Sequence, residues 1–344
     1  MEFLSEYGLF LAKAITFIIA FIVCFSVAAG AAMKNKNHQE ENIEIEKINE
    51  RLSEYKQSLE SAVLNPSELK ALKKEHKNEA KQKKKAAKKE TDTPRKRVYV
   101  TSFDGDIKAS DTDNLRKIIS IILTQAKTDD EVVIKLESSG GMVHSYGFAA
   151  SQLARIKAKN IPLTVCIDHV AASGGYMMAC VANKMIAAPF AIIGSIGVIA
   201  QLPNFHKLLK KTDIDYEMYT AGEYKRTLTM FAENTDKGRE KFIEELEDTH
   251  GLFKDYVSEH RAVVDIDRVA TGEVWFGKRA LDQQLVDELK TSDEYIYDLS
   301  DSADVYEIRI EAKKTLAEKL GFSVVQGLEQ SIYRLFNVLR ARYF

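Results

Sequence analysis

Residues 132–141 read VVIKLESSGG, a run of β-branched and apolar residues that ends in a glycine-rich turn. The same arrangement returns further along the chain, where LTVCI at 163–167 precedes the turn DHVAASGG at 168–175. Between the two lies a stretch with helical spacing that includes Leu153 and Ile156. Strands that alternate with helices pair in parallel, so this stretch predicts an α/β sheet.

The residues before this stretch extend the same alternation. A β-branched strand is expected at 98–103, and the helix after it has one apolar face. The residues of that face are Leu115, Ile118, Ile119, Ile122 and Leu123. Ligands of parallel sheets bind at the carboxyl ends of the strands, where both glycine-rich turns fall. We therefore expect the functional site at the turns 137–141 and 171–176.

The second of these turns contains a serine at the start of a helix. Ser173 is followed by two glycines and by the apolar run YMMACVA at 176–182. An isolated Gly-Gly pair usually makes only a tight turn. Glycine also lets backbone N–H groups approach a ligand, and the first turn of a helix carries partial positive charge. Two such pairs after successive strands, one of them beside a serine, are typical of a nucleophile next to an oxyanion hole.

A serine nucleophile needs a base, and the residues alone leave two choices open. His144 and His169 lie near the two turns, but neither has an obvious acid to orient it. The other choice is a lysine, which accepts a proton only when its pKa falls from about 10.4 to about 7–8. Lys225, within AGEYKRT at 221–227, has turn and aromatic neighbours, as many solvated lysines do.

The N-terminal part of the chain differs from this core. Residues 14–33 form a run of 20 residues without a charge. At about 1.5 Å per residue such a helix spans the roughly 30 Å of a hydrocarbon core. We interpret residues 1–33 as an N-terminal membrane anchor. The alternative is a cleaved signal peptide, against which stand the length of the run and the acidic flank of Glu2 and Glu6.

Charge is divided unevenly along the chain. The whole chain has 49 basic and 51 acidic residues, a net charge of −2. Residues 34–97 form a polar, Lys-rich spacer, in which thirteen basic residues face four acidic ones over 70–97. This segment is either a solvated, partly helical spacer or a contact for anionic lipid. No aromatic residue lies among the lysines, so nucleic acid is not an expected partner.

Two further patterns bear on the spacer and on topology. Apolar residues with spacings of 3 or 4 predict an amphipathic or paired helix within it. These residues are Ile45, Ile48, Leu52, Tyr55 and Leu59. Since positive charge accumulates on the cytoplasmic side of a membrane span, the basic segment favours a cytoplasmic location for everything after the anchor.

Composition excludes several classes of protein. Apolar residues make up 45% of the chain and charged residues 29%, which argues against a disordered, collagen-like or multi-span chain. The three cysteines, Cys24, Cys166 and Cys180, are too few for a disulfide framework and lie in apolar settings. We expect them to be small buried residues, and we expect neither a cofactor nor a metal.

Five segments together resemble, in order and spacing, the peptidases of family S49, the signal peptide peptidase SppA family. The segments are ESSGGMVHSYG at 137–147, DHVAASGGYMMACVA at 168–182, AAPFAIIGSIGV at 187–198, AGEYKRTLT at 221–229 and GEVWFGKRALDQQLVDEL at 272–289. The anchor and the polar extension resemble the SohB branch of that family. The resemblance implies a ClpP/crotonase-like fold for residues 98–312 and a dyad of Ser173 as nucleophile and Lys225 as general base.

The resemblance also implies supporting residues. The oxyanion donors would be the N–H of Gly174 and that of either Gly140 or Gly141. Ser195 would match the hydroxyl that hydrogen-bonds the lysine and orients it. Histidine as the base is disfavoured by the same comparison.

Two residues depart from the pattern of the family. Ser139 stands where the family usually has proline, which removes a fixed φ from the first turn. Gln284 stands where the family usually has glycine, a preferred residue at the end of a helix. These departures bear on rate and local stability rather than on the type of reaction.

The resemblance and the N-terminal anchor together imply a serine endopeptidase, anchored in the bacterial inner membrane, that hydrolyses signal-peptide remnants or other apolar membrane-associated peptides. One alternative is a catalytically weak membrane scaffold or adaptor that keeps the peptidase fold. Another is acyl-CoA chemistry on the same architecture. Expected partners are peptide or membrane-protein substrates, the lipid bilayer and, by resemblance, further copies of the chain. Residues 313–344 have helical apolar spacing and predict an amphipathic tail, either a packing contact or a surface-lying helix.

Overall fold

The computed structural model describes residues 7–10, 13, 16–17, 41–71, 74 and 95–312. Residues 44–309 form one compact unit, and it is this unit that the following paragraphs concern. Most of the predicted anchor and the whole tail at 313–344 lie outside the described residues. Within the residues that are described, no helix is long and apolar enough to cross a membrane.

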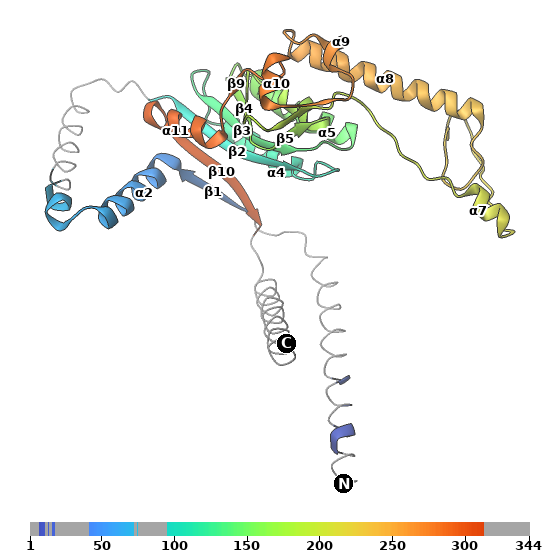
Figure 1. Cartoon of the computed structure of the whole chain (residues 1–344), viewed down its shortest axis with the longest axis horizontal. Helices are drawn as coiled ribbons and strands as arrows, with labels where there is room; N and C mark the ends of the chain where they lie inside the picture. The colour runs from blue at the N-terminus through green and yellow to red at the C-terminus, as the bar shows by residue number, and fades with distance from the viewer. Residues whose placement is uncertain are drawn as a thin grey trace, which may run out of the picture. The chain divides into compact units, whose positions relative to one another are not determined.

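Parallel strands form the centre of the compact unit, in the order β1-β10-β2-β3-β4-β6-β9 (Figure 1). The central strands are β2 (Arg97–Gly105), β3 (Glu131–Ser138), β4 (Leu163–Ile167) and β6 (Lys184–Ala187). The outer strands are β1 (Glu41–Lys47), β10 (Asp304–Ala312) and β9 (Glu288–Leu289). Each pair of central neighbours is parallel, which confirms the predicted α/β class. The ClpP/crotonase-like assignment within that class stays a prediction.

A short branch leaves this sheet beside β3. It consists of β5 (Val170–Ala172), β7 (Ile192–Gly194) and β8 (Val274–Phe276). β5 pairs with β3 and with β7 in parallel, and β7 pairs with β8 in antiparallel fashion. The residues that follow β3, β5 and β7 are therefore brought to one place, and they include both glycine-rich turns.

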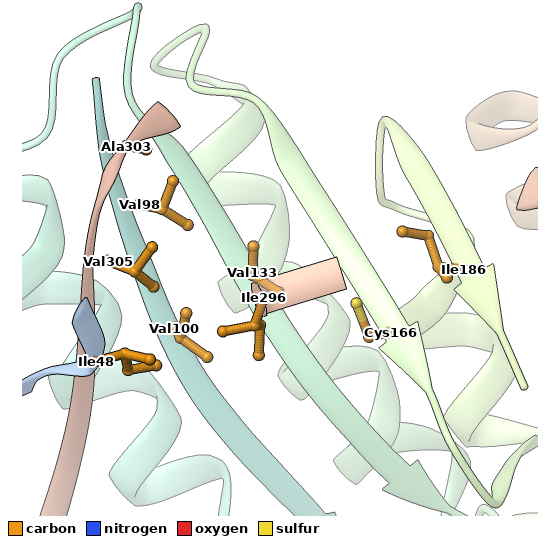
Figure 2. Packing of buried hydrophobic residues seen from close by; sticks show 9 residues of the cluster. All are labelled: Ile48, Val98, Val100, Val133, Cys166, Ile186, Ile296, Ala303 and Val305. Carbon is orange, nitrogen blue, oxygen red and sulfur yellow. The ribbon is translucent and has the colours of Figure 1, made fainter. Parts of the chain in front are cut away.

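Helices cover both faces of the sheet. The helices after the central strands are α4 (Thr112–Leu123), α5 (Val143–Lys157) and α6 (Gly174–Ala179). Four of the five apolar residues predicted to face the core from α4 are buried: Leu115, Ile118, Ile119 and Ile122. The opposite face packs against α2 (Ile48–Val63) and α11 (Ser292–Ser302), with Ile48 and Ile296 over strand residues such as Val100 and Val133 (Figure 2).

The start of the predicted spacer belongs to this packed unit. Ile48 is 3% exposed, and the Asn49 side chain donates to the carbonyls of Ser300 and Ala303 and accepts from the N–H of Val305. Residues 41–63 thus add the strand β1 to the sheet and pack the helix α2 against it, although their composition is polar. The physical reason is that α2 docks through Ile48 and Leu52 on the core cluster, through the satisfied Asn49 amide and through the ion pair of Arg51 with Glu307 at 3.1 Å.

The chain between residues 198 and 236 has little regular structure, apart from the short helix α7 (His206–Lys211). It leads into α8 (Asp236–His260), whose 25 residues make a helix about 37 Å long. Figure 1 shows α8 extending from the neighbourhood of α9 (Ile266–Val269) toward α7. The short helix α10 (Gly277–Asp282) then precedes the last strands.

Candidate active site

Ser173 lies in a sharp turn between β5 and α6. Its φ is 52° and its ψ is −119°, a backbone conformation that non-glycine residues rarely adopt. Such conformations cost about 1–3 kcal/mol and persist only where the surroundings enforce them. Here the Ser173 N–H donates to the carbonyl of Gly194 at 2.8 Å, and the Ser173 carbonyl accepts from the N–H of Met177 at 3.0 Å. A strained serine between a strand and a helix is the geometry of an exposed nucleophile.

The first glycine turn lies directly against this serine. Gly140 has a φ of 87°, and a Cβ atom built on it would be 2.7 Å from the nitrogen of Gly174. The Gly140 N–H donates to the hydroxyl oxygen of Ser138 at 3.0 Å, so it is already occupied. Within the described part of the chain, the N–H of Gly141 has no acceptor. Gly174 is the first residue of α6, and the first N–H groups of a helix have no partner inside it.

Ser195 reaches the same place from the neighbouring strand. It directly follows Gly194, which is paired with Ala172 just before Ser173. Its φ is 50°, and its N–H donates to the carbonyl of Glu273 at 2.7 Å. The pairing of β5 with β7 therefore positions the two serines that sequence analysis singled out.

These residues surround a cavity of about 540 Å³. Its walls are Ser139, Gly140, Gly141, Ser173, Ser195, Gly197, Val198, Ile199, His250, Thr271 and Gly272. The structure thus brings together Ser173, Ser195 and the first glycine pair. The two glycine-rich turns were expected to meet because they end strands of one parallel sheet, and Ser195 was expected from the family resemblance alone. Val198 and Ile199 give part of the wall an apolar character.

Four lining residues were not predicted for the site: Ile199, His250, Thr271 and Gly272. Thr271 and Gly272 arrive with the loop before β8, where the Gly272 N–H donates to the carbonyl of Ile196 at 3.2 Å. His250 comes from α8, and its buried Nε2 atom has no hydrogen-bond partner among the described residues. Sequence spacing gave no signal for it, because it lies 77 positions after Ser173.

The two histidines considered as bases do not line this cavity. His169 lines a separate cavity of about 280 Å³ together with Cys166, Asp168 and Asp293. Burial raises the pKa of Cys166 to about 12, so this thiol is not a thiolate nucleophile. Cys180 is also buried and free, and its pKa is likewise raised to about 12. The described residues contain no group of three or more His, Cys, Asp or Glu side chains that would hold a metal ion.

Lys225 is exposed and does not line the cavity of its own chain. Its neighbour Tyr224 lies under the ammonium groups of Lys237 and Lys241, at 5.9 and 5.5 Å from the ring centre. Lys241 precedes the cavity residue His250 by nine positions, about 14 Å along α8. Lys225 therefore lies outside the cavity that contains Ser173 of the same chain.

The chain is similar in sequence to a family of peptidases. Residues 2–153 match the profile of Peptidase family S49 N-terminal, and residues 155–306 match that of Peptidase family S49. The chain is 47% identical to the Probable protease SohB of Haemophilus influenzae over 350 residues, which cover 100% of this chain and 99% of that protein. The chain belongs to peptidase family S49.

Further similarities are to a second curated relative and to a solved structure. The chain is 44% identical over 303 residues to a Probable protease SohB of Buchnera aphidicola, covering 86% of this chain and 99% of that protein. Among solved structures, a mutant of the 1510-N membrane-bound stomatin-specific protease in complex with a substrate peptide is similar at 14% identity. That similarity has a TM-score of 0.40 and covers 67% of this chain and 99% of that one. Family membership and the names of the relatives support a protease, and they do not favour a scaffold.

Proposed function

We propose that this chain is a serine endopeptidase with Ser173 as nucleophile and Lys225 as general base. The observation that carries the proposal is the backbone of Ser173, which is strained, follows a strand and opens a helix beside the Gly140–Gly141 turn. Its substrates are apolar peptides, such as signal-peptide remnants or segments of membrane proteins. The apolar wall formed by Val198 and Ile199 supports this substrate class.

The proposed reaction combines Ser173 and the glycine turns of the cavity with the amine of Lys225. The Ser173 hydroxyl attacks the peptide carbonyl while the neutral amine of Lys225 takes its proton and passes it to the leaving amine. Water then hydrolyses the acyl-enzyme. The oxyanion is held by the N–H groups of Gly174 and Gly141. The hydrogen bond from Gly140 to Ser138 favours Gly141 over Gly140 in this role.

We infer that Lys225 reaches Ser173 of a neighbouring copy in a homo-oligomer. There the Ser195 hydroxyl of that copy hydrogen-bonds the lysine amine and orients it. Two observations support this arrangement. Lys225 is exposed, and its neighbour Tyr224 packs near the N-terminal end of α8, away from the residue of α8 that lines the cavity. Its segment also exposes many large apolar side chains, which is unusual for a monomer. They are Ile199, Leu202, Phe205, Leu208, Ile214, Tyr216, Met218, Tyr219, Tyr224 and Phe231.

The location of the enzyme is proposed from the sequence. Residues 14–33 anchor the chain in the bacterial inner membrane, and the basic spacer contacts the lipid surface. The charge pattern around this segment favours a cytoplasmic catalytic unit. Cysteine accessibility at an engineered surface position, or a reporter fused after Phe344, tests the topology.

The catalytic proposal is tested with the full-length protein in detergent and a quenched apolar peptide. Ser173→Ala abolishes cleavage, and a serine-directed phosphonate that labels the wild type no longer labels this variant. Lys225→Ala also loses cleavage and labelling. Matched controls are Ser151→Ala on the exposed side of α5 and Lys159→Ala, an exposed lysine just after α5, both of which keep full activity. Cleavage by Ser173→Ala or full activity of Lys225→Ala contradicts the dyad.

A further inference from the structure

A buried tyrosine connects the two glycine turns of the cavity. Tyr146, in α5, is 0% exposed. Its hydroxyl donates to the carbonyl of Asp106 at 2.7 Å and lies 2.5 Å from the hydroxyl of Ser138. Because the single proton of the tyrosine goes to Asp106, the proton of Ser138 fills this close contact in preference to its longer contact of 3.4 Å with the carbonyl of Gly105. The Ser138 oxygen in turn accepts the N–H of Gly140.

The ring of the same tyrosine holds the other turn. A Cβ atom built on Gly174 would clash with ring atoms of Tyr146, so the ring packs on the bare backbone of that glycine. A Cβ atom on Gly175 would lie 2.5 Å from the carbonyl oxygen of Ser138. In the second turn, the ring of Tyr146 therefore packs on Gly174 and the carbonyl of Ser138 lies against Gly175. The same two residues are linked to the first turn through the Ser138 hydroxyl, which accepts the N–H of Gly140.

We propose that Tyr146 and Ser138 are positioning residues that set the spacing between the N–H groups of Gly141 and Gly174. The inference rests on the proposed function, in which these two groups hold the oxyanion. The first turn has Ser139 rather than proline before its glycines, so no ring fixes its backbone there. The hydroxyl chain supplies that restraint.

The expected effect is on the transition state. Oxyanion donors act when they lie about 2.7–3.1 Å from the oxygen, and losing one costs about 10²–10³ in kcat. A positioning residue moves a donor without removing it, so its loss costs less. Neither the Tyr146 hydroxyl nor Ser138 lines the cavity, so substrate affinity is spared.

Tyr146→Phe is the first test, because it keeps the ring on Gly174 and removes only the hydroxyl. We expect kcat to fall about 10-fold with KM within twofold of wild type. Affinity for a peptide aldehyde falls by the same factor, because its adduct with Ser173 places an oxygen in the oxyanion hole. Ser138→Ala gives the same pattern, and it keeps the test decisive if Tyr146→Phe does not fold.

The double variant distinguishes one network from two independent effects. If the hydroxyls act as a chain, Tyr146→Phe combined with Ser138→Ala is no worse than Ser138→Ala alone. Tyr295→Phe is the matched control, because it removes a hydroxyl bond to Glu131 at 2.7 Å, away from the cavity. It lowers the melting temperature and leaves kcat unchanged.

The outcomes separate this inference from the proposed function. Cleavage by Ser173→Ala would overturn the function itself. An inactive Ser173→Ala together with wild-type kcat and aldehyde affinity in both Tyr146→Phe and Ser138→Ala overturns only the positioning role. A fall in melting temperature without a fall in kcat, as in the Tyr295→Phe control, also overturns it.

Discussion

A Cβ atom built on Gly140 would lie 2.7 Å from the Cβ atom of Ser173. The same atom would lie 2.8 Å from the carbonyl oxygen of Ala172, so it meets backbone as well as side chain. Real Cβ atoms do not approach other heavy atoms this closely. The two glycine-rich turns can therefore meet at the nucleophile only because residue 140 has no side chain.

The first prediction follows from this contact. Gly140→Ala has to push the first turn away from Ser173, and its φ of 87° is strained for alanine as well. We expect kcat/KM to fall at least about 100-fold, comparable to the loss of an oxyanion donor. Phosphonate labelling of Ser173 slows in parallel.

Gly147→Ala is the matched control for that change. Gly147 lies in α5, and no atom outside the backbone of its own helix and its chain neighbours lies within 4 Å of a Cβ built on it. Alanine is favoured over glycine inside a helix by about 0.5–1 kcal/mol, so this variant is more stable and fully active. Full activity of Gly140→Ala would show that the two turns do not cooperate.

Strand and turn patterns predicted that Ser173 and the first glycine pair would meet, whereas Ser195 was expected from the family resemblance alone. Ser173, Ser195 and the first glycine pair all follow strands that pair in parallel, so the sheet alone brings them together. The docking of α2 was not foreseen, because it depends on Ile48 within a polar stretch. His250 was not foreseen either, since the path of a long helix past the cavity is a tertiary property.

The second prediction concerns Lys225, which no sheet contact brings to Ser173. If neighbouring copies share a site, co-expressed Ser173→Ala and Lys225→Ala chains form mixed oligomers that regain activity. With equal random mixing in a closed ring, about a quarter of the sites receive both intact residues. Each variant alone stays inactive, and an inactive mixture that still co-purifies would place the base within the same chain.

The third prediction concerns the departure at residue 284. Gln284 follows α10 with a φ of 59°, while the Leu285 N–H donates to the Ala280 carbonyl at 2.8 Å. This is the left-handed helix ending in which glycine is preferred. Gln284→Gly raises the free energy of unfolding by about 1 kcal/mol, measured by chemical denaturation, and leaves kcat unchanged.

The adjacent glutamine provides the control. Gln283 has a φ of −88°, which glycine does not favour over other residues. Gln283→Gly is therefore neutral or destabilising. If both variants are stabilised, the gain comes from losing a glutamine side chain and not from the positive φ of residue 284. If neither is stabilised, that positive φ does not strain the protein.

The last prediction concerns stability at acid pH and rests on Glu131, at the start of β3. Burial by itself raises the pKa of this carboxyl, but hydrogen bonds from Lys96, Tyr295 and Thr164 outweigh it and lower the pKa below its usual value. A lowered folded pKa means that the charged form stabilises the native state above the unfolded pKa of about 4.3. That contribution is lost as pH falls through the folded pKa.

Glu131→Gln removes this dependence. We expect the variant to be less stable than wild type at pH 7, because Lys96 loses its charged partner at 2.6 Å. As pH falls below about 4, the wild type loses the contribution of Glu131 and the difference between the two narrows. Urea denaturation at a series of pH values measures this difference in the free energy of unfolding.

The control is Glu240→Gln, on the exposed surface of α8. Its free energy of unfolding against pH runs parallel to that of wild type. A gap between Glu131→Gln and wild type that stays constant down to pH 3 would contradict the assignment of this acid sensitivity to Glu131.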